Sequence, residues 1–219
     1  GHHLRGTFCG LQQIGELLWL NNINDEKREK CTKVLYQNSK KTFNLLNNLL
    51  KWDSANAGMI TYKPSQLNLH QIALNNVRLF NSQVRFKNLE LSCNFDTDIF
   101  VYADLDMIDT VIRNLLSNAI KFTPTGGKIE IILDEIDVTN NTCTIAIIDS
   151  GIGMARDSQS KVFEIDATIS TLGTDMEKGT GLGLKLCKEF LNLNKGTIWI
   201  ESNENKGTSV FISLPIENK

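Results

Sequence analysis

The fold of this chain is decided by residues 145–153, which read IAIIDSGIG. The first four of these residues are apolar and three of them are β-branched, as is typical of a buried strand. The polar and glycine-rich half of the stretch begins at Asp149 and continues through Gly151 and Gly153. A carboxylate is therefore predicted at the end of a buried strand.

A second glycine-rich stretch, GTGLGL, follows at residues 179–184. Its glycines, Gly179, Gly181 and Gly183, let the backbone approach a ligand closely. Apolar residues at helical spacing continue to residue 191, and the N-terminus of such a helix adds a positive dipole end. The stretch predicts an anion site of the kind that binds phosphate. It lacks the spacing of a dinucleotide G-x-G-x-x-G motif and the Gly-Lys-Ser/Thr of a P-loop.

A third stretch, NLLSNAIKFT at residues 114–123, carries polar side chains on one face of a predicted helix. Asn114 and Asn118 are four residues apart and share a face, and Lys121 falls on the same side. The rest of this helix is apolar, and two amides and a cation are out of place in a core. We therefore expect a polar site on this helix.

Taken together, these stretches resemble the ATP-binding domain of sensor histidine kinases, a branch of the superfamily shared by gyrase, the heat-shock chaperone and a mismatch-repair ATPase. Residues 114–123 resemble the N box, residues 149–153 the G1 box, Phe163-Glu164 the F box and residues 179–184 the G2 box. All four occur in the family's order. The alternative within the superfamily is an ATPase of the gyrase or chaperone branch.

The resemblance implies a role for each motif residue. Asp149 is expected to recognise adenine, whose exocyclic amine can donate to a carboxylate, and Thr208 to support that contact through water. Asn118 is expected to ligate Mg²⁺, which prefers hard oxygen ligands, with Asn114 and Lys121 near the phosphates of ATP. The structural alternatives are a turn-capping aspartate, a surface lysine and an ordinary strand threonine. The other predicted nucleotide-binding residues are Gly151, Gly153, Gly179, Gly181, Leu182 and Gly183.

The first eight residues, GHHLRGTF, resemble the H box of the same family, which places His2 at the phosphorylated position. An imidazole is a suitable nucleophile near neutral pH. The stretch departs from the family at His3, where an acidic residue is usual, and at Gly6-Thr7, which replace Thr-Pro. Gly-His-His is also typical of the remnant of an affinity tag, and that alternative stays open.

Length and composition allow one large domain or two modest ones. The chain has 219 residues, of which 41% are hydrophobic, and a net charge of −2. Without a long basic run, no nucleic acid is expected as a partner, and no stretch approaches the roughly 18 to 20 apolar residues of a membrane span. The five cysteines are scattered and form no C-x-x-C pair, which favours reduced thiols and a cytoplasmic location.

The expected fold class is α+β. Residues 1–58 are predicted to form a helical hairpin from helices over 4–21 and 25–50, with the phosphoacceptor histidine. Two helices cannot bury so wide an apolar stripe alone, so the family's homodimeric four-helix bundle is expected, with packing on the chain's own C-terminal domain as the alternative. Residues 59–219 are predicted to be the ATP-binding catalytic domain, an α/β sandwich of a mixed sheet with three main helices (Bergerat-type).

Within the second domain the pattern predicts individual elements. A helix capped by Asn68 is expected to run to Phe86, and Asp104 is expected to cap the N-box helix. Residues 154–178 are polar and too long for a passive connection, and they resemble the family's ATP lid. Strands are predicted over 89–95, 100–103, 127–133, 142–148, 197–201 and 209–214.

These features predict the catalytic fragment of a bacterial sensor histidine kinase. The resemblance implies Mg-ATP-dependent autophosphorylation on histidine, followed by a phosphorelay to an aspartate in a response-regulator receiver domain. The fragment itself is not expected to contact a membrane, although an anchor in the full-length protein is compatible with this reading. The alternative function is a nucleotide-binding signalling scaffold with a degenerate H box and no phosphotransfer.

Overall fold

The computed structural model describes residues 2–19, 24–36, 39, 42, 61–159, 161–164, 173–174 and 181–216. The chain divides into two compact units, Gly1–Ser54 and Ala55–Lys219. In the first unit, α1 spans His2–Trp19 and residues 25–36 are also helical. The helix α1 begins two residues before the expected range 4–21, and the helix over 25–36 lies within the expected range 25–50; the hairpin itself stays a prediction. Residues 43–60 lie outside the described residues, so the four-helix bundle and the domain boundary at residue 58 stay predictions.

A five-stranded mixed sheet forms the base of the second unit, with the strand order β2-β4-β5-β7-β6. The strands β2 and β4 are parallel, and all other neighbours in this sheet are antiparallel. The mixed sheet expected from the sequence is therefore confirmed. The strands are β2 (Glu90–Cys93), β4 (Lys128–Asp137), β5 (Thr142–Asp149), β6 (Thr197–Asn203) and β7 (Gly207–Pro215).

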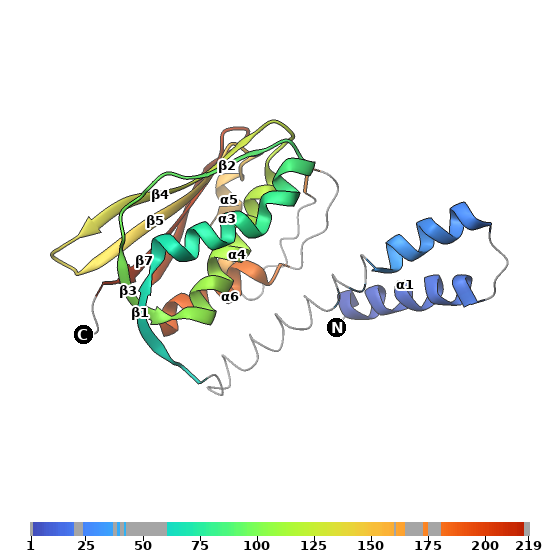
Figure 1. Ribbon diagram of the computed structural model, residues 1–219, viewed down its shortest axis with the longest axis horizontal. Helices are drawn as coiled ribbons and strands as arrows, with labels where there is room; N and C mark the ends of the chain where they lie inside the picture. Colours follow the sequence, from blue (N-terminus) through green and yellow to red (C-terminus); the bar gives the residue numbers. More distant parts are fainter. Residues whose placement is uncertain are drawn as a thin grey trace. The chain divides into compact units, whose positions relative to one another are not determined.

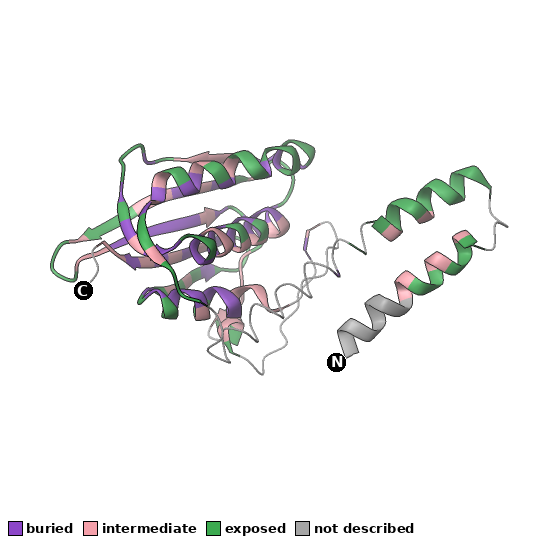
Figure 2. Ribbon diagram, turned by 60° about the horizontal axis from the view of Figure 1, so that its bottom comes forward, coloured by how far each residue is buried: buried purple, intermediate pink, exposed green. Residues whose placement is uncertain are grey.

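Three helices lie on one face of this sheet (Figure 1): α3 (Leu69–Phe86), α4 (Leu105–Phe122) and α6 (Gly183–Leu193). The core lies between the helices and the sheet, and Figure 2 shows buried residues along the strands and on one side of each helix. In β5, Cys143, Ile145 and Ile147 alternate toward the helices and are buried. The α+β fold with three main helices is thereby confirmed. Two short helices, α5 (Arg156–Gln159) and the 3₁₀ helix η1 (Lys161–Phe163), follow β5.

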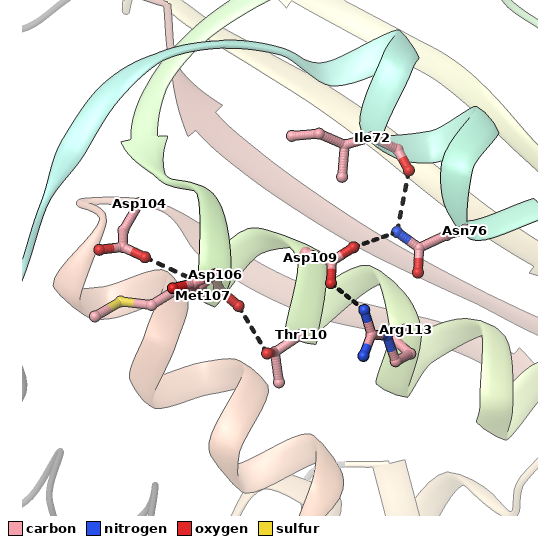
Figure 3. Close-up of polar contacts among 8 residues, drawn as sticks. All are labelled: Ile72, Asn76, Asp104, Asp106, Met107, Asp109, Thr110 and Arg113. Carbon is pink, nitrogen blue, oxygen red and sulfur yellow. Dashed lines mark hydrogen bonds and ion pairs between the residues drawn. The ribbon is translucent and has the colours of Figure 1, made fainter. Parts of the chain in front are cut away.

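Both predicted helix caps are present. The Asn68 side chain accepts a hydrogen bond of 3.1 Å from the Gln71 N–H, and α3 ends at Phe86 as expected. Asp104 accepts one of 3.2 Å from the Met107 N–H at the beginning of α4 (Figure 3). Its second oxygen accepts from the Lys63 N–H at 2.9 Å, so this carboxylate also holds the chain that leads into β1.

Several strand bounds differ from the sequence-based expectation: β2 is shorter than 89–95, and β6 and β7 extend beyond 197–201 and 209–214. Two further differences concern β1 and β4. A strand at Pro64–Asn68, β1, was not predicted, because its proline and polar residues give no alternation; it pairs with β3 (Phe100–Asp104). The strand β4 extends to Asp137, beyond the predicted end at residue 133, with a bulge between Leu133 and Glu135. This extension is held by the ladder with β5, and its exposed side chains include only one apolar residue, Ile136, so the sequence gives no alternating apolar pattern there.

Buried amides link the helices to one another. Asn194, directly after α6, is fully buried; its Oδ1 accepts from the Asp104 N–H at 2.7 Å and its Nδ2 donates to Phe190 O at 2.6 Å. The Asn76 amide of α3 donates to Asp109 of α4 at 2.7 Å, and Asp109 also pairs with Arg113 (Figure 3). The position of α4 is thus set by α3 on one side and by the end of α6 on the other.

Among the described helices, none combines the length and hydropathy needed to cross a bilayer.

We expect Asn194→Ala to lower the free energy of unfolding of the second unit by about 1 to 3 kcal/mol, because it leaves the buried Asp104 N–H without an acceptor. Urea denaturation followed by near-UV circular dichroism measures this. The matched control is Asn192→Ala, at an exposed position of the same helix, which should change stability by less than about 0.5 kcal/mol. Equal midpoints for the two variants would contradict the assigned role of Asn194.

Candidate functional site

Asp149 is the last residue of β5 and is only 8% exposed. Its Oδ1 accepts hydrogen bonds from the N–H of Gly151 at 2.8 Å and of Thr208 at 3.2 Å. The described residues provide no hydrogen-bond donor to Oδ2. Burial raises the pKa of the Asp149 carboxyl to about 6, and the two backbone hydrogen bonds offset this only in part. The predicted carboxylate at a strand end is therefore present, buried and only half satisfied.

Hydroxyl groups of β6 and β7 lie next to this carboxylate. Thr208 lies directly opposite Asp149 in the β5–β7 ladder, and its hydroxyl is 2.9 Å from the Ser202 hydroxyl. Ser202 donates to Gly207 O at 3.0 Å and accepts from the Met154 N–H at 2.9 Å. Ser202 was missed in the sequence, where the only signal is its inward register in line with Ile198 and Ile200. The Thr208 and Ser202 hydroxyls therefore connect the end of β5 to Met154, in the segment after the G1 box.

The G1-box glycines pass close to the protein's own backbone. A Cβ on Gly151 would lie 2.5 Å from Asp149 Oδ1 and 2.6 Å from Phe122 O. Gly153 has φ +66°, and a Cβ there would lie 1.9 Å from Asn203 O. Between them, the Ile152 N–H donates to Phe122 O at 3.1 Å. Both glycines are thus required by packing between the end of α4 and the end of β6, and their role toward a nucleotide stays a prediction.

The N-box residues Asn114, Asn118 and Lys121 lie on α4 and are all half-buried. A Cβ added to Gly183 would lie 3.4 Å from Asn114 Oδ1, so the N box and the G2 box are adjacent. The neighbouring Cys187 thiol lies 3.9 Å from Val111 O; burial raises its pKa to about 12, against hydrogen bonds that lower it, one of them from Asn114. Cys187 and Cys143 are both fully buried core residues.

The Lys121 ammonium lies 4.3 Å from the ring centroid of Phe122. Lys121 lies in the last turn of α4, and in the same turn Phe122 O accepts a hydrogen bond from the Ile152 N–H. Phe122 therefore joins the N box to the G1 loop. Of the described side chains, no three His, Cys, Asp or Glu residues are grouped so as to hold a metal ion. A metal held by Asn118 would need further oxygen ligands from a bound nucleotide.

The G2 box leads into α6 as expected. Gly181 has φ +71°, Leu182 occupies the N-cap position without a side-chain cap hydrogen bond, and Gly183 begins the helix. The N-terminal N–H groups of a helix and the positive end of its dipole are suited to bind an anion. The structure brings Asp149, Gly151 and Thr208 together in one group and Asn114 and Gly183 in a second. Gly179 and the side chain of His2 lie outside the described residues.

Known proteins resemble this chain over almost its whole length. It is 28% identical to the sensor protein EvgS of Escherichia coli (strain K12) over 219 residues, which are 99% of this chain and 18% of EvgS. It is 30% identical to the adaptive-response sensory kinase SasA of Gloeothece citriformis (strain PCC 7424), over 98% of this chain and 56% of SasA. The chain therefore spans from about a fifth to just over half of the length of these relatives.

Solved structures give the same picture. The catalytic domain of the histidine kinase ThkA matches with a TM-score of 0.59 and 27% identity, over 70% of this chain and 96% of that domain. ThkA in complex with the response regulator protein TrrA matches with a TM-score of 0.75 over 99% of this chain and 59% of that chain. Full-length ShkA in complex with AMPPNP matches with a TM-score of 0.71 over 100% of this chain and 45% of that chain. The last two are each 20% identical, and their likeness concerns the fold alone.

The family model described as "Histidine kinase-, DNA gyrase B-, and HSP90-like ATPase" matches residues 103–218, more than half of the chain. These residues contain the N, G1, F and G2 boxes together with Thr208. With the buried carboxylate at the end of β5 and the glycine-led helix beside α4, the match shows that the chain belongs to this ATPase family, in its sensor histidine kinase branch.

Proposed function

We propose that the second unit binds Mg-ATP and that the chain is the catalytic fragment of a protein-histidine kinase. The observation that carries this proposal is the half-satisfied carboxylate of Asp149. Asp149 is buried and its Oδ2 accepts no hydrogen bond from the described residues, so a ligand that brings a donor to this oxygen gains a hydrogen bond. The exocyclic amine of adenine is such a donor. Thr208 and Ser202 would hold the polar environment beside it.

The phosphate groups would lie toward α6 and α4. The N-terminus of α6 supplies backbone N–H groups, and Asn114, Asn118 and Lys121 supply two amides and a cation from the adjacent helix. Mg²⁺, when bound, neutralises phosphate charge. The Asn118 amide oxygen is the ligand that this chain would offer to it. Amides, backbone N–H groups and one cation are groups that suit a polyanion such as the triphosphate of ATP.

The proposed reaction transfers the γ-phosphoryl group of ATP to the imidazole of His2. A nitrogen–phosphorus bond forms, the bond from the γ-phosphorus to the bridging oxygen breaks, ADP leaves and the imidazole loses its N–H proton. The chain's contribution would be the positioning of the reactants and the neutralisation of charge, which dominate phosphoryl transfer.

We further propose homodimerisation through the first unit, a receiver-domain aspartate as the later acceptor and a cytoplasmic, bacterial setting. The kinship with sensor kinases supports these proposals.

Asp149→Asn is expected to weaken binding of adenosine nucleotides at least about 10-fold, as the loss of one buried hydrogen bond predicts. Two backbone N–H groups already point at Oδ1, so the amide must place its NH₂ group against these donors or against the adenine amine. Isothermal titration calorimetry with Mg-ATP measures the change. Asp96→Asn, an exposed change of the same kind, is the control. An unchanged affinity in the Asp149 variant would remove the basis of the proposal.

Binding of adenosine, which has no phosphate to titrate, should weaken as the pH falls from about 7.5 to 5.5. Burial raises the pKa of Asp149 to about 6. Once the carboxylate is protonated, the oxygen that carries the proton no longer accepts a hydrogen bond from the adenine amine. Stability should respond in the opposite direction. The folded pKa lies above the ordinary value of 3.8, so this group stabilises the fold most at low pH and that contribution is lost as pH rises through about 6.

The measurement compares wild type with Asp149→Asn at each pH. The stability of wild type relative to the variant should be greater at pH 5 than at pH 7, and the pH dependence of adenosine binding should be confined to wild type. A variant that keeps the wild-type pH profile would show that another group titrates.

Incubation with γ-³²P-labelled ATP tests the phosphoacceptor. The wild-type chain should acquire label that is labile in acid and stable in alkali, as a phosphoimidazole is, and His2→Ala should abolish it. The matched control is His3→Ala, which should keep the label. Label retained by His2→Ala would reject this histidine as the acceptor, whereas nucleotide binding without any label would favour the signalling scaffold.

A further inference from the structure

Lys87 is a buried cation outside the residues that the family model matches. It follows α3 directly and is only 6% exposed. Its ammonium donates to Thr174 Oγ1 at 2.7 Å, to Ile120 O at 2.8 Å and to Lys121 O at 3.3 Å. The last two oxygens belong to the C-terminal turn of α4, the N-box helix.

Thr174 reaches the same turn from the segment between the G1 and G2 boxes. Its backbone N–H donates to Lys121 O at 3.1 Å, and its hydroxyl lies 3.1 Å from Lys121 O and 3.3 Å from Thr123 O. Gly173, just before it, is buried. Three segments far apart in the sequence therefore meet at one point, which we call the α4 C-terminal junction: Lys87, residues 120–123 and Thr174.

The physical basis of this junction is the open end of a helix. The last carbonyl groups of an α-helix have no intrahelical partner, and they carry the negative end of the helix dipole. A cation placed there is stabilised by both effects, and a buried ammonium in turn needs the acceptors. Lys87 and the carbonyls of Ile120 and Lys121 therefore satisfy each other. Thr174 completes the set because its hydroxyl can accept from the ammonium and donate to a carbonyl.

We propose that Lys87 and Thr174 are positioning residues for the phosphate side of the nucleotide site, an inference that rests on the proposed function. Through the junction they fix the turn that carries Lys121. The adenine side is held differently. Asp149 is fixed by the ladders of β5 with β4 and β7 and by the N–H groups of Gly151 and Thr208. Weakening the junction should therefore affect phosphate contacts more than base contacts.

The experiment measures Mg-ATP and adenosine affinities separately by calorimetry on the full 219-residue chain. For Lys87→Met and for Thr174→Val we expect at least about a 10-fold loss of Mg-ATP affinity, which corresponds to about 1.4 kcal/mol, and less than about a 2-fold change for adenosine. Thr174→Ser keeps the hydroxyl and should bind Mg-ATP as wild type does. Lys188→Met removes the same kind of side chain from an exposed position of α6 and should leave both affinities unchanged.

The outcomes separate this inference from the proposed function. If the variants lose Mg-ATP and adenosine binding equally, or if Thr174→Val binds Mg-ATP like Thr174→Ser, the positioning role is overturned while wild-type binding still supports the function. If wild type binds neither ligand, the proposed function fails and the inference with it. Should Lys87→Met not fold, the comparison of the two Thr174 variants decides alone.

Discussion

The constraint on which the second unit depends is the burial of a carboxylate at the end of β5. Placing Asp149 inside the protein costs desolvation energy, and the raised pKa shows that two backbone N–H donors do not fully offset it. The Gly151 N–H reaches the Asp149 side chain because only two residues separate them, and the Thr208 N–H reaches it because Thr208 lies opposite Asp149 in the β5–β7 ladder. At Gly207, before Thr208, φ is +90° and a Cβ would lie 1.9 Å from Asp149 O. The glycines of this region are therefore needed to bring donors to one acidic side chain.

The second constraint is that α4 is fixed at both ends. At its beginning Asp104 caps the helix, and the Asp104 N–H is held by Asn194. At its end Lys87 and Thr174 bind the last carbonyl groups. The Asn-bearing face in between is thus presented by a rigid element whose neighbours are also fixed, which is the arrangement a binding site needs if its polar groups are to keep their geometry.

Sequence patterns predicted the parts of this structure that rest on local chemistry. The caps at Asn68 and Asp104, the strand ending in Asp149 and the helix after the G2 glycines all have short-range signals, and all are confirmed. Ser202 and Lys87 could not be found in this way. A serine in a strand and a lysine after a helix are ordinary surface residues by composition, and lysine is almost never fully buried unless it is paired. Their roles arise from partners that are distant in sequence and come together only in the fold.

The two halves of the site also differ in the sign of their charge, and this sets the direction in which a nucleotide would bind. Asp149 is negative when ionised, whereas the N-terminal end of α6 and Lys121 are positive. Unlike charges attract at short range in a partly buried site, and like charges repel with similar strength. A nucleotide turned the other way would bring its phosphates to the carboxylate and force it to protonate. Because Phe122 joins the G1 loop to the last turn of α4, the two halves are held in a fixed order. In the proposed complex, the orientation of the nucleotide would therefore follow from electrostatics.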